Sequence, residues 1–397
     1  MLLSGCATYQ SKVASARDFI EQKNFSAAID HLEPLAKEEN KDQLVYLLDY
    51  AVALQLAGRI EDSNRSFLLA DRLVEQMDYH SVTKVTSSLL LNEEMVQYKG
   101  DTFEKIFIHA YLAMNFLDLQ KLDEALVEAR QINENYKKYQ ADSKTDIRQI
   151  SFGKYLSAII WEASQQYDDA YIAFQESYKL DPSISGIEKD LLRTAKLSRR
   201  DDAYNKWLKN FGHLKSDSIE KLKSNEGELI VLYQQGWGPR KNFNPNNSFA
   251  PRLASTFSKT QTAELSLNEL TRVKSYRVYD VDRASKQTLE ADQASLVAKR
   301  IGALAAKEIA ADQIRQKNQV LGLLTWVTLH ASERADLRQW STLPESVQII
   351  RVRLPVGSYN LQLQGLDGTG QPTGEKSVRS IEIKNQKTSF WVWRSVK

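Results

Sequence analysis

The sequence has little of what a disulfide-bonded, nucleic-acid-binding or membrane-spanning protein needs. Cys6 is the only cysteine among 397 residues, so no intramolecular disulfide framework can form. The formal net charge is +2, which gives no strong overall field to attract nucleic acid. The best apolar stretch, residues 320–329, is about half as long as a membrane-spanning helix. We expect it to be a buried core helix, with an interfacial or partner-binding segment as the alternatives.

Motifs for metal binding and catalysis are also missing. The histidines are scattered, and none stands at metal-ligand spacing from another histidine or from the cysteine. They are His31, His80, His109, His213 and His330. There is no Gly-x-Ser-x-Gly elbow, no Ser-x-x-Lys motif near a plausible set of partners, and no glycine loop for phosphate. The sequence therefore predicts a protein that is not an enzyme and holds no metal or cofactor.

Residues 3–6, Leu-Ser-Gly-Cys, resemble the lipobox of bacterial lipoproteins. In that motif the cysteine thiol accepts the lipid, and the small residues before it let the peptidase approach the backbone. The next residue, Ala7, is not aspartate, which by this resemblance implies the outer membrane. Because only five residues precede Cys6, we expect the rest of the secretory signal to lie upstream of Met1. The alternative is an ordinary cytosolic cysteine near a flexible terminus. Residues 1–10 are thus predicted to be lipobox and tether.

Residues 150–182 have the pattern of two packed helices that end in Asp181-Pro182. Small residues stand where the helices would touch, and large apolar residues fill the spaces between them. The segment resembles a tetratricopeptide repeat. Three further units align with it, and Phe25 and Ile60 lie 35 residues apart, close to one repeat length. A degenerate repeat is expected near residues 79–99.

The resemblance implies a helical repeat domain over residues 11–224, in which residues 183–224 cap the array. Repeat arrays of this kind bind extended peptides or helices on their concave face. Polar residues of the first helix in each pair are the candidates for that face, although a solvated face has the same appearance. They are Asp49, Gln55, Asn115 and Lys154.

Residues 225–341 change character and are predicted to form an α+β region. Residues 228–234 and 273–281 read as strands, and residues 285–318 read as a long helix. Between them, Trp237, Arg240 and Lys241 form a candidate contact patch for a partner. The alternative is a turn that ends the strand beneath an aromatic lid.

Residues 342–397 are predicted to form a small antiparallel β-sandwich-like module. Strands are expected at 347–354, 357–363, 380–383 and 388–396, with a turn at Asp367-Gly368. The Leu-Pro-Val-Gly-Ser-Tyr stretch at 354–359 resembles the start of a strand in carboxypeptidase-regulatory or immunoglobulin-like sandwiches. The predicted fold is mainly α plus β: an N-terminal repeat solenoid, an α+β region and this module.

A dense polar and aromatic group stands between the long helix and the β-module. It contains Arg334, Asp336, Arg338 and Trp340. Charged residues gathered around a tryptophan are compatible with a partner-binding site, and equally with a buried ion-pair junction.

The chain resembles a group of bacterial lipoproteins with tetratricopeptide-like repeats. The resemblance lies in the lipobox, the repeats, the stretch VLYQQGWGPRK, and the stretch ERADLRQWSTLP that leads into LPVGSYNLQL. Members are often encoded near lipoproteins related to penicillin-binding-protein activators. The resemblance implies a non-catalytic, lipid-anchored outer-membrane scaffold that faces the periplasm and serves cell-envelope assembly. Its partners would be envelope proteins, including another lipoprotein, and not nucleic acid. The alternatives are a subunit of a secretion or polysaccharide-export machine, or an envelope hydrolase.

Overall fold

The computed structural model describes residues 9–81, 97–141, 150–212, 214, 222–246, 250–268, 270–317 and 335–397. Cys6, Arg334, the apolar stretch 320–329 and most of the degenerate repeat expected at 79–99 lie outside these residues. The chain divides into two compact units. Unit 1 comprises Met1–Asp101, Pro239–Ser255 and Ser285–Thr342, and unit 2 comprises Thr102–Gly238, Thr256–Ala284 and Leu343–Lys397.

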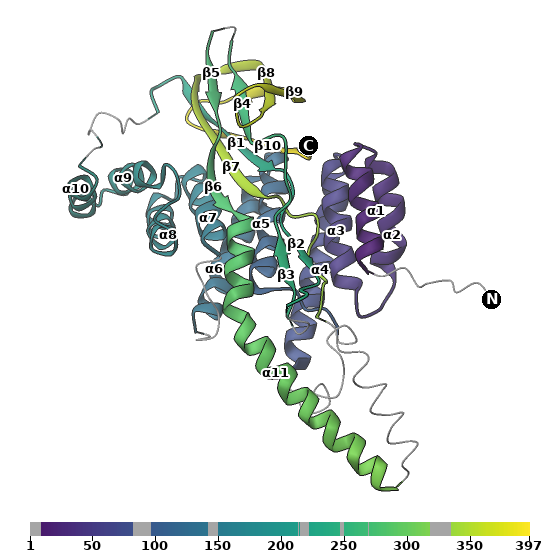
Figure 1. The fold of residues 1–397 in the computed structure, drawn as a ribbon. Coiled ribbons are helices and arrows are strands. Elements are labelled where there is room, and N and C mark those ends of the chain that lie inside the picture. The colour runs from purple at the N-terminus through teal and green to yellow at the C-terminus, as the bar shows by residue number, and fades with distance from the viewer. Residues whose placement is uncertain are drawn as a thin grey trace. The chain divides into compact units, whose positions relative to one another are not determined.

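Unit 1 begins with four helices in antiparallel pairs (Figure 1). They are α1 (Tyr9–Glu21), α2 (Phe25–Lys37), α3 (Gln43–Leu56) and α4 (Ile60–Ser81). The core helix is α3, in which nearly every residue from Leu44 to Gln55 is buried. The unit also holds a small antiparallel ribbon of β2 (Arg240–Asn242) and β3 (Arg252–Ala254), and most of the long helix α11 (Val281–Lys317).

Unit 2 contains further helix pairs and two β-sheets. The helices are α5 (Thr102–Asp118), α6 (Leu122–Ala141), α7 (Ser151–Ala163), α8 (Tyr167–Leu180), α9 (Ile187–Leu197) and α10 (Asp201–Asn210). Apart from α7, these helices carry acidic residues in their first turns, such as Asp123 and Glu124 in α6, which suits the positive end of a helix dipole. Among the described residues, no helix is long and apolar enough to cross a membrane.

One turn geometry recurs in five helix pairs of the described chain. Each turn has a residue in the left-handed region, with φ between 58° and 75°. Its N–H bonds to the carbonyl three residues back, and the N–H of the next residue bonds to the carbonyl five residues back. This pair of hydrogen bonds closes the end of a helix in the Schellman pattern. The five residues are Lys23, Gly58, Gln120, Gln165 and Arg199. The recurrence shows that the helices form repeats, two pairs in unit 1 and three in unit 2.

The two four-stranded sheets of unit 2 pack around one apolar core. The first sheet has the order β10 (Thr388–Ser395), β1 (Glu226–Gln235), β7 (Ser346–Pro355), β6 (Tyr276–Asp280). The second has the order β5 (Arg272–Lys274), β4 (Thr262–Ser266), β8 (Gly357–Leu366), β9 (Pro372–Ile383). Alternating residues of both sheets meet between them, including Val231, Ile350, Leu363 and Trp391.

The predicted strands and the long helix are present, but the predicted separation of a 342–397 module is wrong. β1, from the preceding region, lies between β7 and β10, and it pairs with β10 in parallel. β4 and β5 likewise complete the sheet of β8 and β9. The predicted region 225–341 is divided between the two units, and the helical region 11–224 is divided after Asp101. Alternation identifies a strand but not its partner, because pairing is set by contacts remote in sequence.

Candidate interaction surfaces

In unit 1, residues 335–342 form a segment, here called the strap, that covers one face of α1 and α3. Residues 335–340 belong to no helix or strand, and Ser341 and Thr342 form a turn. Three alternate carbonyls of the strap accept hydrogen bonds from α1. Gln10 donates to Leu337 over 2.8 Å, Tyr9 donates to Gln339, and Arg17 donates to Ser341 over 2.7 Å. We call this covered face of α1 and α3 the inner face of unit 1. It binds a segment of its own chain through backbone carbonyls at alternate residues.

Two side chains between those carbonyls, Arg338 and Trp340, are buried in unit 1. The Arg338 guanidinium is 2.8 Å from the Asp42 carboxylate, also binds Asp336, and lies 5.4 Å from the Tyr98 ring centroid. Trp340 is 1% exposed, and its ring centroid lies 5.7 Å from that of Phe67. The predicted cluster around Arg338 is therefore an ion-pair junction inside unit 1, with Asp336 at its edge.

Asp49 of α3 anchors the end of the strap. Its Oδ1 accepts hydrogen bonds from the Thr342 N–H (3.0 Å) and hydroxyl (2.8 Å), and its Oδ2 accepts one from the Ser341 hydroxyl (2.9 Å). Asp49 is 0% exposed. Burial raises the pKa of Asp49 to about 6, although the hydrogen bonds from Thr342 and Ser341 and the charge of Arg17 lower it. Asp49 was predicted to lie on an open binding face, and it is instead buried by the strap.

In unit 2, the first sheet covers the helices in place of a strap. Tyr279 of β6 packs against Phe107 of α5 and Phe152 of α7, with ring centroids 5.5 and 5.7 Å away. The Gln234 amide of β1 lies 3.9 Å from the Met114 sulfur of α5. The face of α5 and α7 that would otherwise be open is therefore filled by β-structure.

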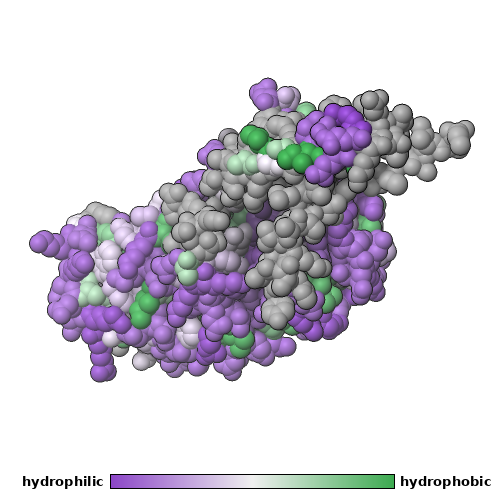
Figure 2. All heavy atoms as spheres, turned by 90° about the horizontal axis from the view of Figure 1, so that it is seen from below, coloured by the Kyte–Doolittle hydropathy of each residue, from purple (hydrophilic) through white to green (hydrophobic). Residues whose placement is uncertain are grey.

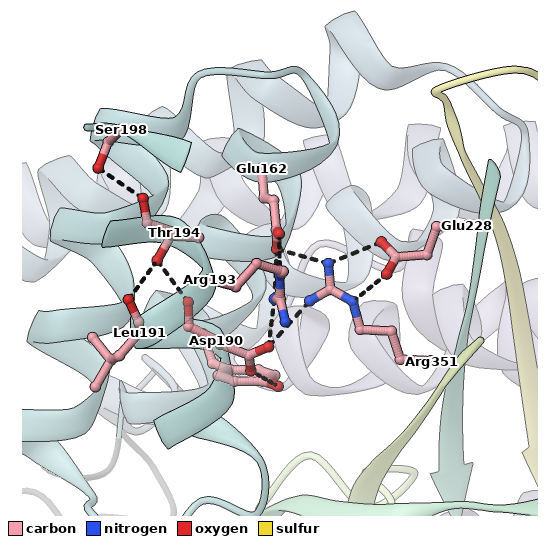
Figure 3. A network of polar contacts seen from close by, with 9 residues as sticks. Glu162, Asp190, Leu191, Arg193, Thr194, Ser198, Glu228 and Arg351 are labelled. Atoms are coloured by element: carbon pink, nitrogen blue, oxygen red, sulfur yellow. Dashed lines mark hydrogen bonds and ion pairs between the residues drawn. The ribbon is translucent and has the colours of Figure 1, made fainter. Parts of the chain in front are cut away.

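A buried network of charges joins the helices of unit 2 to this sheet (Figure 3). Arg351 of β7 binds Glu228 of β1 through two hydrogen bonds of 2.7 and 2.8 Å. The same guanidinium lies 2.8 Å from Glu162 of α7 and 3.2 Å from Asp190 of α9. A second arginine, Arg193, binds Glu162 over 2.6 Å and Asp190 over 2.5 Å.

This network is structural, because its charged groups bind one another. Burial raises the pKa of Glu162, but Arg193 and Arg351 outweigh it and bring that pKa to about 2. Tyr155 donates a further hydrogen bond of 2.8 Å to Asp190. None of these residues was predicted from the sequence to form a site. The available signal was Arg351 itself, a charge within the apolar alternation of residues 347–354.

Side chains from the end of α5 cover the outer edge of β10. The Val392 N–H donates to Asp118 over 2.8 Å, and the Phe390 N–H donates to the Gln120 side chain over 3.2 Å. Gln120 in turn donates to the Phe390 carbonyl over 2.6 Å. These contacts satisfy edge groups that could otherwise pair with another strand.

The other residues predicted to bind a partner are not gathered on one open surface. Asn115 and Gln55 are buried in α5 and α3. Lys154 is buried between helices of unit 2, where it contacts Asn133 and Glu176 and lies 4.5 Å from the Tyr136 ring centroid. Burial lowers the pKa of Lys154, although Glu176 opposes that shift. The structure therefore does not place these three residues on an open concave face, because all three are buried.

The predicted patch of Trp237, Arg240 and Lys241 is divided between the units. Trp237 belongs to unit 2, is 2% exposed, and donates from its indole N–H to the Val396 carbonyl over 2.9 Å. Arg240 and Lys241 belong to unit 1, where Arg240 binds Gln10 over 3.0 Å and Lys241 lies 3.1 Å from Asp101. The aromatic-lid alternative describes Trp237 better than a contact patch does.

Unit 1 also has an open groove between α2, α3 and α4, with a volume of about 1040 Å³. Its lining combines Leu47, Leu54 and Leu69 with charged residues. Those charges are largely paired within the groove, as in the 2.7 Å contact of Lys37 with Glu33. The groove thus offers a mixed surface without a dominant sign of charge.

Outside the groove, large hydrophobic side chains are scattered over the surface. In the view of Figure 2 the described residues are mainly hydrophilic, with hydrophobic side chains in small spots. Single exposed apolar residues of this kind are normal for folded proteins. Among the described residues, no group of histidine, cysteine, aspartate or glutamate could hold a metal ion.

No model of a protein family matches the chain, and no curated protein matches it. Solved structures with partial likeness are helical repeat proteins. MamA from Desulfovibrio magneticus is 13% identical with a TM-score of 0.33, over 52% of this chain and 94% of its own. A tetratricopeptide repeat protein from Parabacteroides merdae is 13% identical with a TM-score of 0.33, over 51% and 67%. A kinesin light chain from Podospora anserina is 12% identical with a TM-score of 0.36, over 53% and 97%. With scores this low, the recurring turn remains the reason to describe a repeat array.

Proposed function

We propose that this protein is a non-catalytic scaffold that binds protein partners in the cell envelope. The observation that carries the proposal is the inner face of unit 1, where α1 and α3 hold an extended segment by its backbone and side chains. A helix face that binds an extended chain in this way is the means by which repeat proteins bind partners.

The described residues also favour binding over catalysis. Among the described residues, the carboxylates that come together are bound to arginines: Glu162, Asp190 and Glu228 to Arg351, and Asp42 and Asp336 to Arg338. The space between the two sheets is filled by apolar side chains. An envelope hydrolase would need a carboxylate pair or a nucleophile at an open cleft.

We further propose that lipid at Cys6 holds the protein in the outer membrane, facing the periplasm, and that its partners are envelope proteins, including another lipoprotein. The support is the Leu-Ser-Gly-Cys run at residues 3–6, followed by Ala7. More than one acyl chain on a lipidated cysteine gives the stable attachment that this role requires.

The test compares three forms of the protein in cells: wild type, Cys6→Ala and Ala7→Asp. We expect wild type in the outer-membrane fraction, Cys6→Ala in the soluble fraction, and Ala7→Asp in the inner membrane. Identical fractionation of all three forms would refute lipid anchoring.

The scaffold role is tested separately by crosslinking in intact cells, followed by purification and mass spectrometry. We expect wild type to retain a discrete set of envelope proteins, and Cys6→Ala to lose them. Turnover of peptidoglycan by the purified protein, abolished by one polar substitution, would instead establish an enzyme.

A further inference from the structure

The hydrogen bonds that hold the strap are regularly spaced along its backbone. Its carbonyls at Leu337, Gln339 and Ser341 face donors of α1, and these are alternate residues of an extended chain. The side chains of the intervening residues point into unit 1. The backbone contacts therefore set the register of the bound segment, and those side chains give the selectivity.

Three side chains of the strap are recognised by separate features. Arg338 enters a site made by Asp42 and the Tyr98 ring, which pairs opposite charges and adds a cation–π contact. Trp340 fills an apolar site against Phe67. Thr342 bonds to Asp49 with both its N–H and its hydroxyl. The pattern read by the inner face is therefore Arg-Xaa-Trp-Xaa-Thr, with a turn at its last two residues.

Helix and sheet ladders do not hold this segment. Residues 335–340 belong to no helix or strand, and the strap's contacts come largely from side chains of α1, α3 and neighbouring loops. A separate peptide with the same pattern can make the same contacts, because none of the groups that read the strap requires its covalent connection to the rest of the chain.

We propose that the inner face of unit 1 is a recognition site for an Arg-Xaa-Trp-Xaa-Thr segment of a partner protein, and that the strap occupies it until the partner displaces it. This inference rests on the proposed scaffold function and names the chemistry of the partner. Competition by the tethered strap acts at an effective concentration on the order of millimolar, so the site is masked in the free protein.

The test uses a fluorescent peptide with the sequence of residues 335–343, ADLRQWSTL, and the purified full-length chain. Binding is measured by fluorescence anisotropy to wild type and to Trp340→Ala, whose own strap is weakened. We expect Trp340→Ala to bind the peptide at least tenfold more tightly than wild type does. Peptides with alanine in place of the arginine or the tryptophan should lose most of this affinity.

Controls separate recognition from loss of structure. Glu33→Gln, a change on α2 away from the strap, should behave as wild type. Adding Asp42→Asn to Trp340→Ala should abolish the preference for the arginine-containing peptide. If Trp340→Ala does not fold, as judged by circular dichroism, Arg338→Ala replaces it and keeps the tryptophan in place.

Two outcomes would overturn the proposal. One is a folded, strap-weakened chain that binds ADLRQWSTL no better than a scrambled peptide. The other is strap exchange, in which the variant forms a heterodimer with wild type and takes up no peptide, so that the occupant is a second copy. A negative result with purified protein leaves the cellular test of the scaffold role unaffected, so the two failures are distinguishable.

Discussion

In both units the face formed by the first helices of the pairs is covered, but by different kinds of structure. In unit 1 the cover is a short irregular strap, held by hydrogen bonds from α1 and by the buried carboxylate of Asp49. In unit 2 it is a four-stranded sheet, held by aromatic packing and by the Arg351 network. The difference indicates that a repeat face can become a permanent core or remain a site for one extended segment.

The largest expected effect is the loss of Arg351. Arg351→Met should lower the free energy of unfolding by about 3–5 kcal/mol, because it leaves Glu228 and Glu162 buried without their shared partner. The matching change in unit 1, Arg338→Met, should cost about 1–2 kcal/mol, because Asp42 and Asp336 are partly exposed and water can solvate them.

Urea denaturation of both variants measures this comparison. Adding Glu228→Gln to Arg351→Met should recover part of the loss, since one uncompensated charge is removed. Equal losses for Arg351→Met and Arg338→Met would contradict the distinction between a permanent and a partly solvated cover.

The second effect is a difference in pH response. The pKa of Asp49 is about 6 in the folded state, against an ordinary value of 3.8. Between these two values, the folded state therefore binds a proton at Asp49 that the unfolded state does not. The stability contributed by protonated Asp49 is present at low pH and is lost as pH rises through about 6. Lowering the pH from 7 to 5 should therefore stabilise unit 1 by about 1–2 kcal/mol.

Glu162 should respond in the opposite direction and at lower pH. Its pKa is about 2, below the ordinary 4.5, so the stability it contributes is lost as pH falls from about 4.5 toward 2. Thermal unfolding between pH 7 and pH 5 should lose most of its pH dependence in Asp49→Asn and keep it in Glu162→Gln. An unchanged pH profile in Asp49→Asn would show that another group titrates.

The third effect concerns the protected edge of unit 2. Asp118→Ala removes the acceptor for the Val392 N–H and a partner of Arg379, and should cost about 1–2 kcal/mol. Because the edge of β10 is then open at Val392 and covered by Gln120 only at Phe390, light scattering should also show more self-association. Asp118→Asn keeps an acceptor and serves as the conservative control. Asp118→Ala protein that stays monomeric would argue that the edge needs no cover.

The smallest effect tests the turn that both units share. Arg199 is exposed and adopts φ of 58°, so Arg199→Gly should stabilise unit 2 by up to about 1 kcal/mol. In unit 1, Gly58 has open space around it but φ of 75°, so Gly58→Ala should destabilise by about 1 kcal/mol from backbone strain alone. Differential scanning calorimetry can resolve these opposite shifts, and shifts of the same sign would contradict the shared turn.

The helices and strands were predictable because their signals are local. The spacing of Phe25 and Ile60 anticipated two repeat turns, and the alternation of residues 347–354 anticipated β7. The candidate binding residues were less predictable. A polar residue on the first helix of a pair has the same sequence signal whether it faces solvent or, like Asp49, a segment nearly 300 residues further along. Arg351 was missed for the same reason, since its three carboxylate partners come from α7, α9 and β1.

The sequence by itself determined the helix pairs and the positions of the strands, because helix and strand periodicities depend on neighbours within a few residues. Only the tertiary structure decided that β1 would separate β7 from β10, that the strap would cover α1 and α3, and that five buried charges would meet at one point. Burial and ion pairing depend on which distant segments arrive at a face, and a local pattern carries no record of that.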